Sequence, residues 1–142
     1  MGGMGSSQMN TVYAIPCPDY EQAGERLTDL LHMMGGIDQF VAPGEKIALK
    51  VNLLLAAAPE KAITTHPAIV TAVGRMAKAQ DADPFIIDSP TGGYPYNAGT
   101  MKRVYRESTM TQAAQKAGIE LNLDTTHKAI SFTDGKLTKH FD

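Results

Sequence analysis

The chain alternates between short apolar runs and longer amphipathic segments, the pattern of a protein in which strands and helices follow each other. The short runs are rich in β-branched, aliphatic or aromatic residues, and we expect strands at 11–16, 46–53, 85–87 and 119–123. Between these runs, apolar residues recur every three or four positions, which predicts helices over 20–34, 67–80 and 101–117.

Local signals support these helix boundaries. Asp19 is a suitable N-cap for the first helix, and Pro67 suits the first position of the second. The third helical region is expected to break near residues 108–109, where Thr109 and Gln112 have the spacing of a weak capping box. Gly118 then ends this region.

Alternation of strands with helices implies parallel pairing through right-handed crossovers. Near the C-terminus, residues 128–132 and 136–140 flank the turn sequence Thr133-Asp134-Gly135, which predicts a hairpin. The fold class is therefore predicted to be α/β, a mostly parallel sheet with flanking helices and a C-terminal β-hairpin. We expect residues 11–142 to form a single α/β domain, part of a longer protein, and residues 1–10 to be a disordered leader or cloning remnant.

Composition narrows the function classes. The 142 residues are 43% hydrophobic and 20% charged with a net charge of −2, typical of a globular protein but not of one that wraps nucleic acid. No apolar run approaches the roughly 20 residues of a membrane span. Cys17, the single cysteine, can form no internal disulfide and cannot alone hold zinc or an iron–sulfur cluster, so we expect no metal site and a cytoplasmic location.

Polar residues that could bind a ligand follow the predicted strands at their carboxyl ends, where open α/β sheets bind ligands. Lys50 and Asn52 are two residues apart and so share a face of the second strand. The candidate ligand-binding residues are Lys50, Asn52, Thr64, Thr65, His66, Asp88, Ser89, Gly92 and Gly93.

Each candidate also has a purely structural interpretation. Lys50 could cover the sheet edge with its aliphatic stem, and Asn52 could hold a turn. Residues 64–66 either cap the second helix or present its free N–H groups to an anion. Asp88 either serves as a ligand contact or a base, or caps the turn that follows it. The segment 91–99 either cradles a phosphate with its glycines or is a mobile surface loop.

Four short segments together resemble a known family. They are Leu49–Leu54, Pro59–Ala62, Thr64–Pro67 and Asp88–Pro90. In this order they resemble the uncharacterised "domain of unknown function three-six-two" family, and the likeness extends from about Val12 to Asp124. Val51 is a departure, since the family usually has proline there. The resemblance implies a longer polypeptide in which clustered cysteines, absent here, ligate iron–sulfur clusters in a ferredoxin-type module.

Our leading hypothesis is an α/β ligand-binding domain of an iron–sulfur-associated protein that holds a small anionic molecule at the strand carboxyl ends. One alternative is an enzyme domain that uses Lys50, His66 and Asp88 in proton transfer. Another is a structural domain that docks a ferredoxin-type module or other redox partner. We expect no cofactor in this chain, no nucleic-acid partner and no membrane partner.

Overall fold

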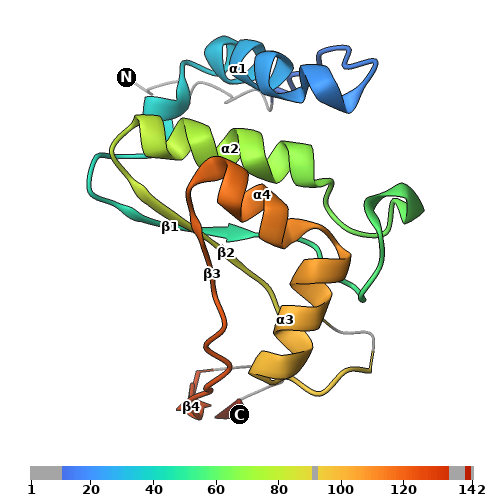
Figure 1. Cartoon of the computed structure of the whole chain (residues 1–142). Helices are drawn as coiled ribbons and strands as arrows, with labels where there is room; N and C mark the ends of the chain where they lie inside the picture. Colours follow the sequence, from blue (N-terminus) through green and yellow to red (C-terminus); the bar gives the residue numbers. More distant parts are fainter. Residues whose placement is uncertain (1–10, 91–92, 135–139, 142) are drawn as a thin grey trace, which may run out of the picture.

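The computed structural model describes residues 11–90, 93–134 and 140–141 (Figure 1). Its helices are α1 (Ala23–Met33), α2 (Pro67–Ala79), α3 (Ala98–Glu107) and α4 (Met110–Ala117), with short 3-10 turns η1 (Tyr20–Gln22), η2 (Ile37–Gln39) and η3 (Pro59–Lys61). Its strands are β1 (Lys46–Lys50), β2 (Asp83–Ile87), β3 (Glu120–Leu121), β4 (Ile130–Ser131) and β5 (His140–Phe141).

The first three strands form a parallel sheet in the order β1-β2-β3. Ala48 pairs with Phe85, and Phe85 pairs in turn with Glu120, so the centres of the three strands are level. Strands β4 and β5 pair separately and antiparallel. The predicted α/β class is thus confirmed, and the C-terminal segment does pair antiparallel. The pairing joins Ile130–Ser131 to His140–Phe141 and so differs in register from a hairpin closed tightly at 133–135. Residues 135–139 lie outside the described residues.

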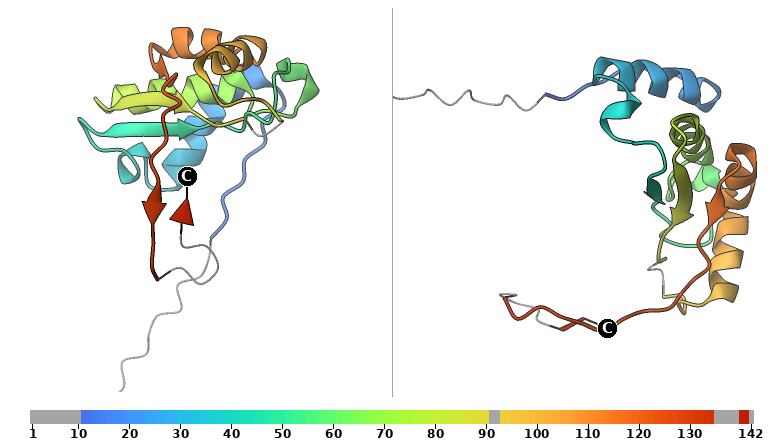
Figure 2. Two further views of the ribbon diagram at one scale, coloured as in Figure 1. Left: turned by 90° about the horizontal axis from the view of Figure 1, so that it is seen from below. Right: turned by 90° about the vertical axis from the view of Figure 1, so that its left-hand side faces the viewer.

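Helices α2 and α4 pack on one face of the sheet, where the main core lies. Ile86 from the central strand and Val104, Tyr105 and Met110 from the helices are each 0% exposed. Helix α1 packs on α2 rather than on the sheet. Figure 2 shows these helices on one side, while the N-terminal segment and the C-terminal hairpin project to the other.

The strand expected at residues 11–16 is absent, and this prediction was wrong. The segment belongs to no strand, with Val12 89% exposed and Tyr13 40% exposed. Figure 2 shows why: the segment leaves the body of the molecule and does not run beside the sheet. Apolar and β-branched residues favour an extended backbone, but a strand also needs a neighbour with which to pair.

Two predicted strands are shorter than expected. The strand expected over residues 46–53 ends at Lys50, as β1. The Val51 amide still donates to the Ile87 carbonyl at 3.3 Å. Beyond it, the Leu53 amide donates to the side chain of Asp88 instead of to a strand backbone. The last parallel strand, expected over 119–123, is reduced to Glu120–Leu121.

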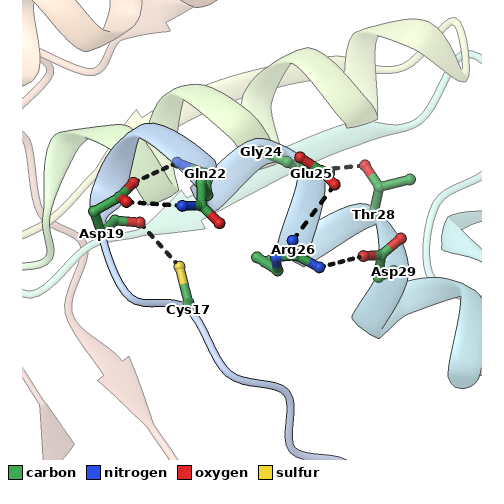
Figure 3. Close-up of polar contacts among 8 residues, drawn as sticks. All are labelled: Cys17, Asp19, Gln22, Gly24, Glu25, Arg26, Thr28 and Asp29. Atoms are coloured by element: carbon green, nitrogen blue, oxygen red, sulfur yellow. Dashed lines mark hydrogen bonds and ion pairs between the residues drawn. The ribbon is translucent and has the colours of Figure 1, made fainter.

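The helix boundaries follow local chemistry. Asp19 caps η1, which leads directly into α1, and its carboxylate accepts from the Gln22 amide at 3.0 Å (Figure 3). The break between α3 and α4 is confirmed at residues 108–109. The capping box is not, because Thr109 has a φ of 58° and its side chain makes no cap hydrogen bond. Gly118 ends α4 with a φ of 66°, as predicted.

Candidate functional site

A buried carboxylate and an exposed ammonium group meet where β1 and β2 end. The Asp88 side chain is 4% exposed and the Lys50 side chain 69%, and Lys50 Nζ donates to Asp88 Oδ1. The other carboxylate oxygen, Oδ2, accepts from the Leu53 amide at 2.5 Å. Lys50 Nζ also lies 3.3 Å from the Val51 carbonyl oxygen. Asp88 is therefore satisfied inside the protein, and it fixes a cation that faces solvent.

Tyr105 of α3 is the buried neighbour of this pair and was not anticipated from the sequence. Its hydroxyl donates to the Asn122 carbonyl at 3.1 Å, which ties α3 to the end of β3. Burial, followed by the proximity of Tyr96, raises the pKa of Tyr105 to about 12. A hydrogen bond with the Asp88 backbone opposes this shift, and the charge of Asp88 adds a smaller increase. A tyrosine on the apolar face of a helix, which needs a partner for its hydroxyl, is the sequence signal that could have indicated it.

The segment between β1 and α2 is closed by two hydrogen bonds between Asn52 and Thr65. The Asn52 amide donates to Thr65 Oγ1 at 3.0 Å, and the Thr65 amide donates to the Asn52 carbonyl at 3.1 Å. Leu53 and Thr64 form an isolated antiparallel bridge between them. Both hydrogen bonds use the backbone of Asn52, and Asn52 is an exposed residue, two positions after Lys50. The buried Oγ1 of Thr64 has no hydrogen-bond partner among the described residues.

His66 caps α2, so the structural interpretation of this residue is the one that the geometry supports. Its Nδ1 accepts from the Ala68 amide at 3.2 Å, and its carbonyl accepts from the Ile69 amide at 3.1 Å. The amides of Ala68 and Ile69 in the first turn of α2 are therefore already bonded to His66, as in the capping alternative for residues 64–66. Partial burial lowers the pKa of His66, while the nearby Glu60 opposes the shift.

The imidazole ring of His66 also lies in different surroundings from the Lys50–Asp88 pair. It stacks on Tyr20 with ring centroids 3.5 Å apart and planes 10° from parallel. Both rings line a cavity of about 790 Å³ whose walls include neither Lys50 nor Asp88. The structure thus brings together two of the three residues invoked for proton transfer and places the third in a separate cavity.

The remaining candidates lie in the segment after β2. Ser89 follows Asp88 and is exposed. Gly93 is also exposed and has a φ of 78°, a left-handed conformation that glycine adopts without strain. Gly92 lies outside the described residues. Of the nine predicted residues, Lys50 and Asp88 are in direct contact, and Asn52 joins Thr65 in the adjacent segment.

No group of three or more histidine, cysteine, aspartate or glutamate side chains in the described part of the chain is arranged to hold a metal ion. The thiol of Cys17 is exposed and donates to the Asp19 carbonyl at 3.1 Å (Figure 3). Within the same described residues, no helix combines the length and the hydrophobicity needed to cross a membrane.

Comparison with known proteins matches residues 47–142 to the family described as "Domain of unknown function (DUF362)". The thylakoid-associated protein sll1697 of Synechocystis sp. (strain ATCC 27184 / PCC 6803 / Kazusa) is 39% identical over 67 residues, which are 47% of this chain and 21% of the relative. The match therefore covers about a fifth of that protein's length. No solved structure matches the chain. The family match includes Lys50 and Asp88 but leaves out η1 and its Tyr20.

The capping role of His66 predicts a pH-dependent stability. The unfolded chain protonates this imidazole near pH 6.5, whereas the folded chain does so only at lower pH. The contribution of neutral His66 is therefore complete above pH 6.5 and is lost as the pH falls toward the lowered folded-state value. At neutral pH we expect His66→Ala to lower the free energy of unfolding by about 1 kcal/mol through loss of the cap.

The measurement is urea unfolding of the wild type, His66→Ala and His66→Asn between pH 7.5 and pH 5. Asparagine supplies a cap oxygen that does not titrate, so the stability of His66→Asn should fall less with acid than that of the wild type. An equally steep fall in both proteins would contradict the role of His66.

Proposed function

Because the chain belongs to the DUF362 family, whose description names no activity, we propose its function from the geometry: it binds a small carboxylate or phosphate through Lys50 at the carboxyl ends of β1 and β2. The observation that carries this proposal is an exposed ammonium group held in place by the buried carboxylate of Asp88.

The hydrogen-bonding capacity of Lys50 leaves room for a ligand. An ammonium group has three N–H donors. Asp88 takes one and the Val51 carbonyl lies within reach of a second, which leaves the third for a molecule that approaches from solvent. Restraint by Asp88 also reduces the conformational entropy that a free lysine side chain would lose on binding.

The location supports the same function. In open parallel sheets, ligands bind beyond the carboxyl ends of the strands, and Lys50 is the last residue of β1. The exposed Asn52 and Ser89 lie on the two segments that leave this edge, and both residue types can donate hydrogen bonds to an anion. With one ammonium as the main contact, we expect a dissociation constant on the order of 1 mM for a small anion.

The test is a titration with inorganic phosphate and with acetate, followed by the amide NMR signals of the assigned protein. In the wild type we expect saturable shifts at residues 50–53 and at Asp88. Lys50→Gln should abolish these shifts. Lys46→Gln is the matched control, since Lys46 lies on the same strand and its ammonium sits 5.1 Å from the ring centroid of Phe85.

Equal loss of binding in Lys46→Gln and Lys50→Gln would show that the anion is attracted by the overall positive charge of the strand. That result would refute a specific site at Lys50. Absence of shifts in the wild type would refute anion binding altogether. Association with a ferredoxin-type iron–sulfur module stays a prediction, as does a cytoplasmic location.

A further inference from the structure

The cavity beside His66 is a trough between three helices. Helix α2 forms its floor, with α1 and η1 along one wall and α4 along the other. Figure 1 shows α2 between α1 and α4. Floor residues such as Ala68 and Ala72 are small, and Ala72 lies 3.9 Å from the position of a Cβ built on Gly24 of α1. At about 790 Å³, the trough falls within the size range of small-molecule sites.

One end of the trough is aromatic and acidic. Tyr20 and His66 form the stacked pair there, and Tyr20 remains 55% exposed, so part of its surface is available to a further planar group. Glu21 and Glu60 line the same end and form no ion pair among the described residues. An exposed aromatic ring can stack on a planar ring, and neighbouring carboxylates can accept hydrogen bonds from it. This end therefore favours a planar ring that carries hydrogen-bond donors, such as an amino-substituted heterocycle.

The opposite end is cationic. The Arg75 guanidinium donates to the Lys116 carbonyl through Nε at 3.1 Å and through one terminal nitrogen at 2.9 Å. These bonds hold the Arg75 side chain of α2 against α4, and its other terminal nitrogen has no hydrogen bond within the described part of the chain. Lys116 lines this end from α4, and its ammonium forms no ion pair among the described residues. Two cations at one end of a cavity favour an anionic group, most of all a phosphate.

The two ends are separated by a ligand-sized distance. His66 and Arg75 are nine residues apart along α2, or about 13 Å of helix. The wall also includes Thr109, the residue before α4, and Gln112 of α4, two residues with polar side chains. We propose that this trough binds a nucleoside monophosphate, with the amino-substituted base stacked at the Tyr20 end and the phosphate between Arg75 and Lys116.

The experiment is isothermal calorimetry with AMP, adenosine and ribose 5-phosphate. It uses the Lys50→Gln protein, so that binding of phosphate at the strand ends does not contribute. We expect AMP to bind at least about tenfold more tightly than either fragment, because only AMP reaches both ends of the trough. Equal affinities of AMP and ribose 5-phosphate would overturn the proposal, as would an absence of AMP binding.

Three variants in the same background separate the ends of the trough. Lys116→Gln should weaken AMP about threefold to tenfold and leave adenosine unchanged, whereas Tyr20→Ala should weaken both ligands and Tyr20→Phe neither. Lys102→Gln on α3, outside the trough, is the control for loss of one exposed cation. If AMP affinity responds equally to Lys116→Gln and Lys102→Gln, or does not respond to Tyr20→Ala, the assignment of this trough is wrong.

Discussion

Replacement of Asp88 by alanine is expected to lower the free energy of unfolding by about 2–4 kcal/mol. The carboxylate is 4% exposed and is the acceptor for the Leu53 amide, itself part of a residue that is 1% exposed. Alanine would leave this amide buried without a partner and would also open a small void. The ion pair with Lys50 adds less, because the lysine side chain is 69% exposed and water can replace its partner.

Asp88→Asn separates these two contributions. The asparagine oxygen can still accept from the Leu53 amide, so we expect a loss of only about 1 kcal/mol in this variant. Chemical denaturation at pH 7 gives both values. Similar losses for Asp88→Ala and Asp88→Asn would mean that the charge of Asp88, and not its bond to the Leu53 amide, stabilises the end of β2.

Replacement of Gly74 by leucine is expected to cost about 3 kcal/mol of stability, because the space around this glycine is occupied. A Cβ at this position would lie 2.8 Å from Ile119 Cδ1 and 3.2 Å from Ala117 Cβ. The Ile119 contact is with the tip of a flexible side chain, but Ala117 is fixed to the backbone of α4. A larger side chain would therefore push α4 away from α2.

Alanine substitutions provide the matched comparison. Gly24 in α1 has Ala72 Cβ at an ordinary 3.9 Å, so Gly24→Ala should stabilise the protein by about 0.5–1 kcal/mol through helix propensity alone. In Gly74→Ala, the same gain is offset by the close contacts. Thermal unfolding of the two variants and Gly74→Leu measures the difference. If both alanine variants stabilise the protein equally, the packing of α2 on α4 is looser than the contact distances at Gly74 indicate.

The elements with several independent sequence signals were predicted correctly. For α2, the apolar spacing, Pro67 at the first position and the polar residues after Gln80 all agree, and the helix runs from Pro67 to Ala79. The segment 11–16 had only its composition to support a strand. Whether such a segment pairs depends on where the chain leads it in space, and neither periodicity nor propensity contains this information.

The sequence could predict those features of the candidate site that follow from the order and pairing of the strands. Parallel pairing places the ends of β1 and β2 side by side, and so the proximity of Lys50 and Asp88 follows from the order of the elements. The orientation of His66 does not follow, because its ring is directed by stacking on Tyr20, a residue 46 positions earlier in the printed sequence. The acceptor role of Asp88 toward the Leu53 amide depends equally on three-dimensional packing.

The paired contacts of Asn52 with Thr65 have a consequence for how this protein can diverge. Together with the bridge between Leu53 and Thr64, they join the residues on either side of the segment 54–63, so this segment is a closed loop. Insertions there would lengthen a loop that is already closed, at a cost of only about 0.6 kcal/mol for each doubling of its length. Homologous proteins can therefore carry insertions or substitutions around Glu60, at one end of the helical trough, while the contact between Lys50 and Asp88 is kept. The two candidate binding regions are free to evolve at different rates.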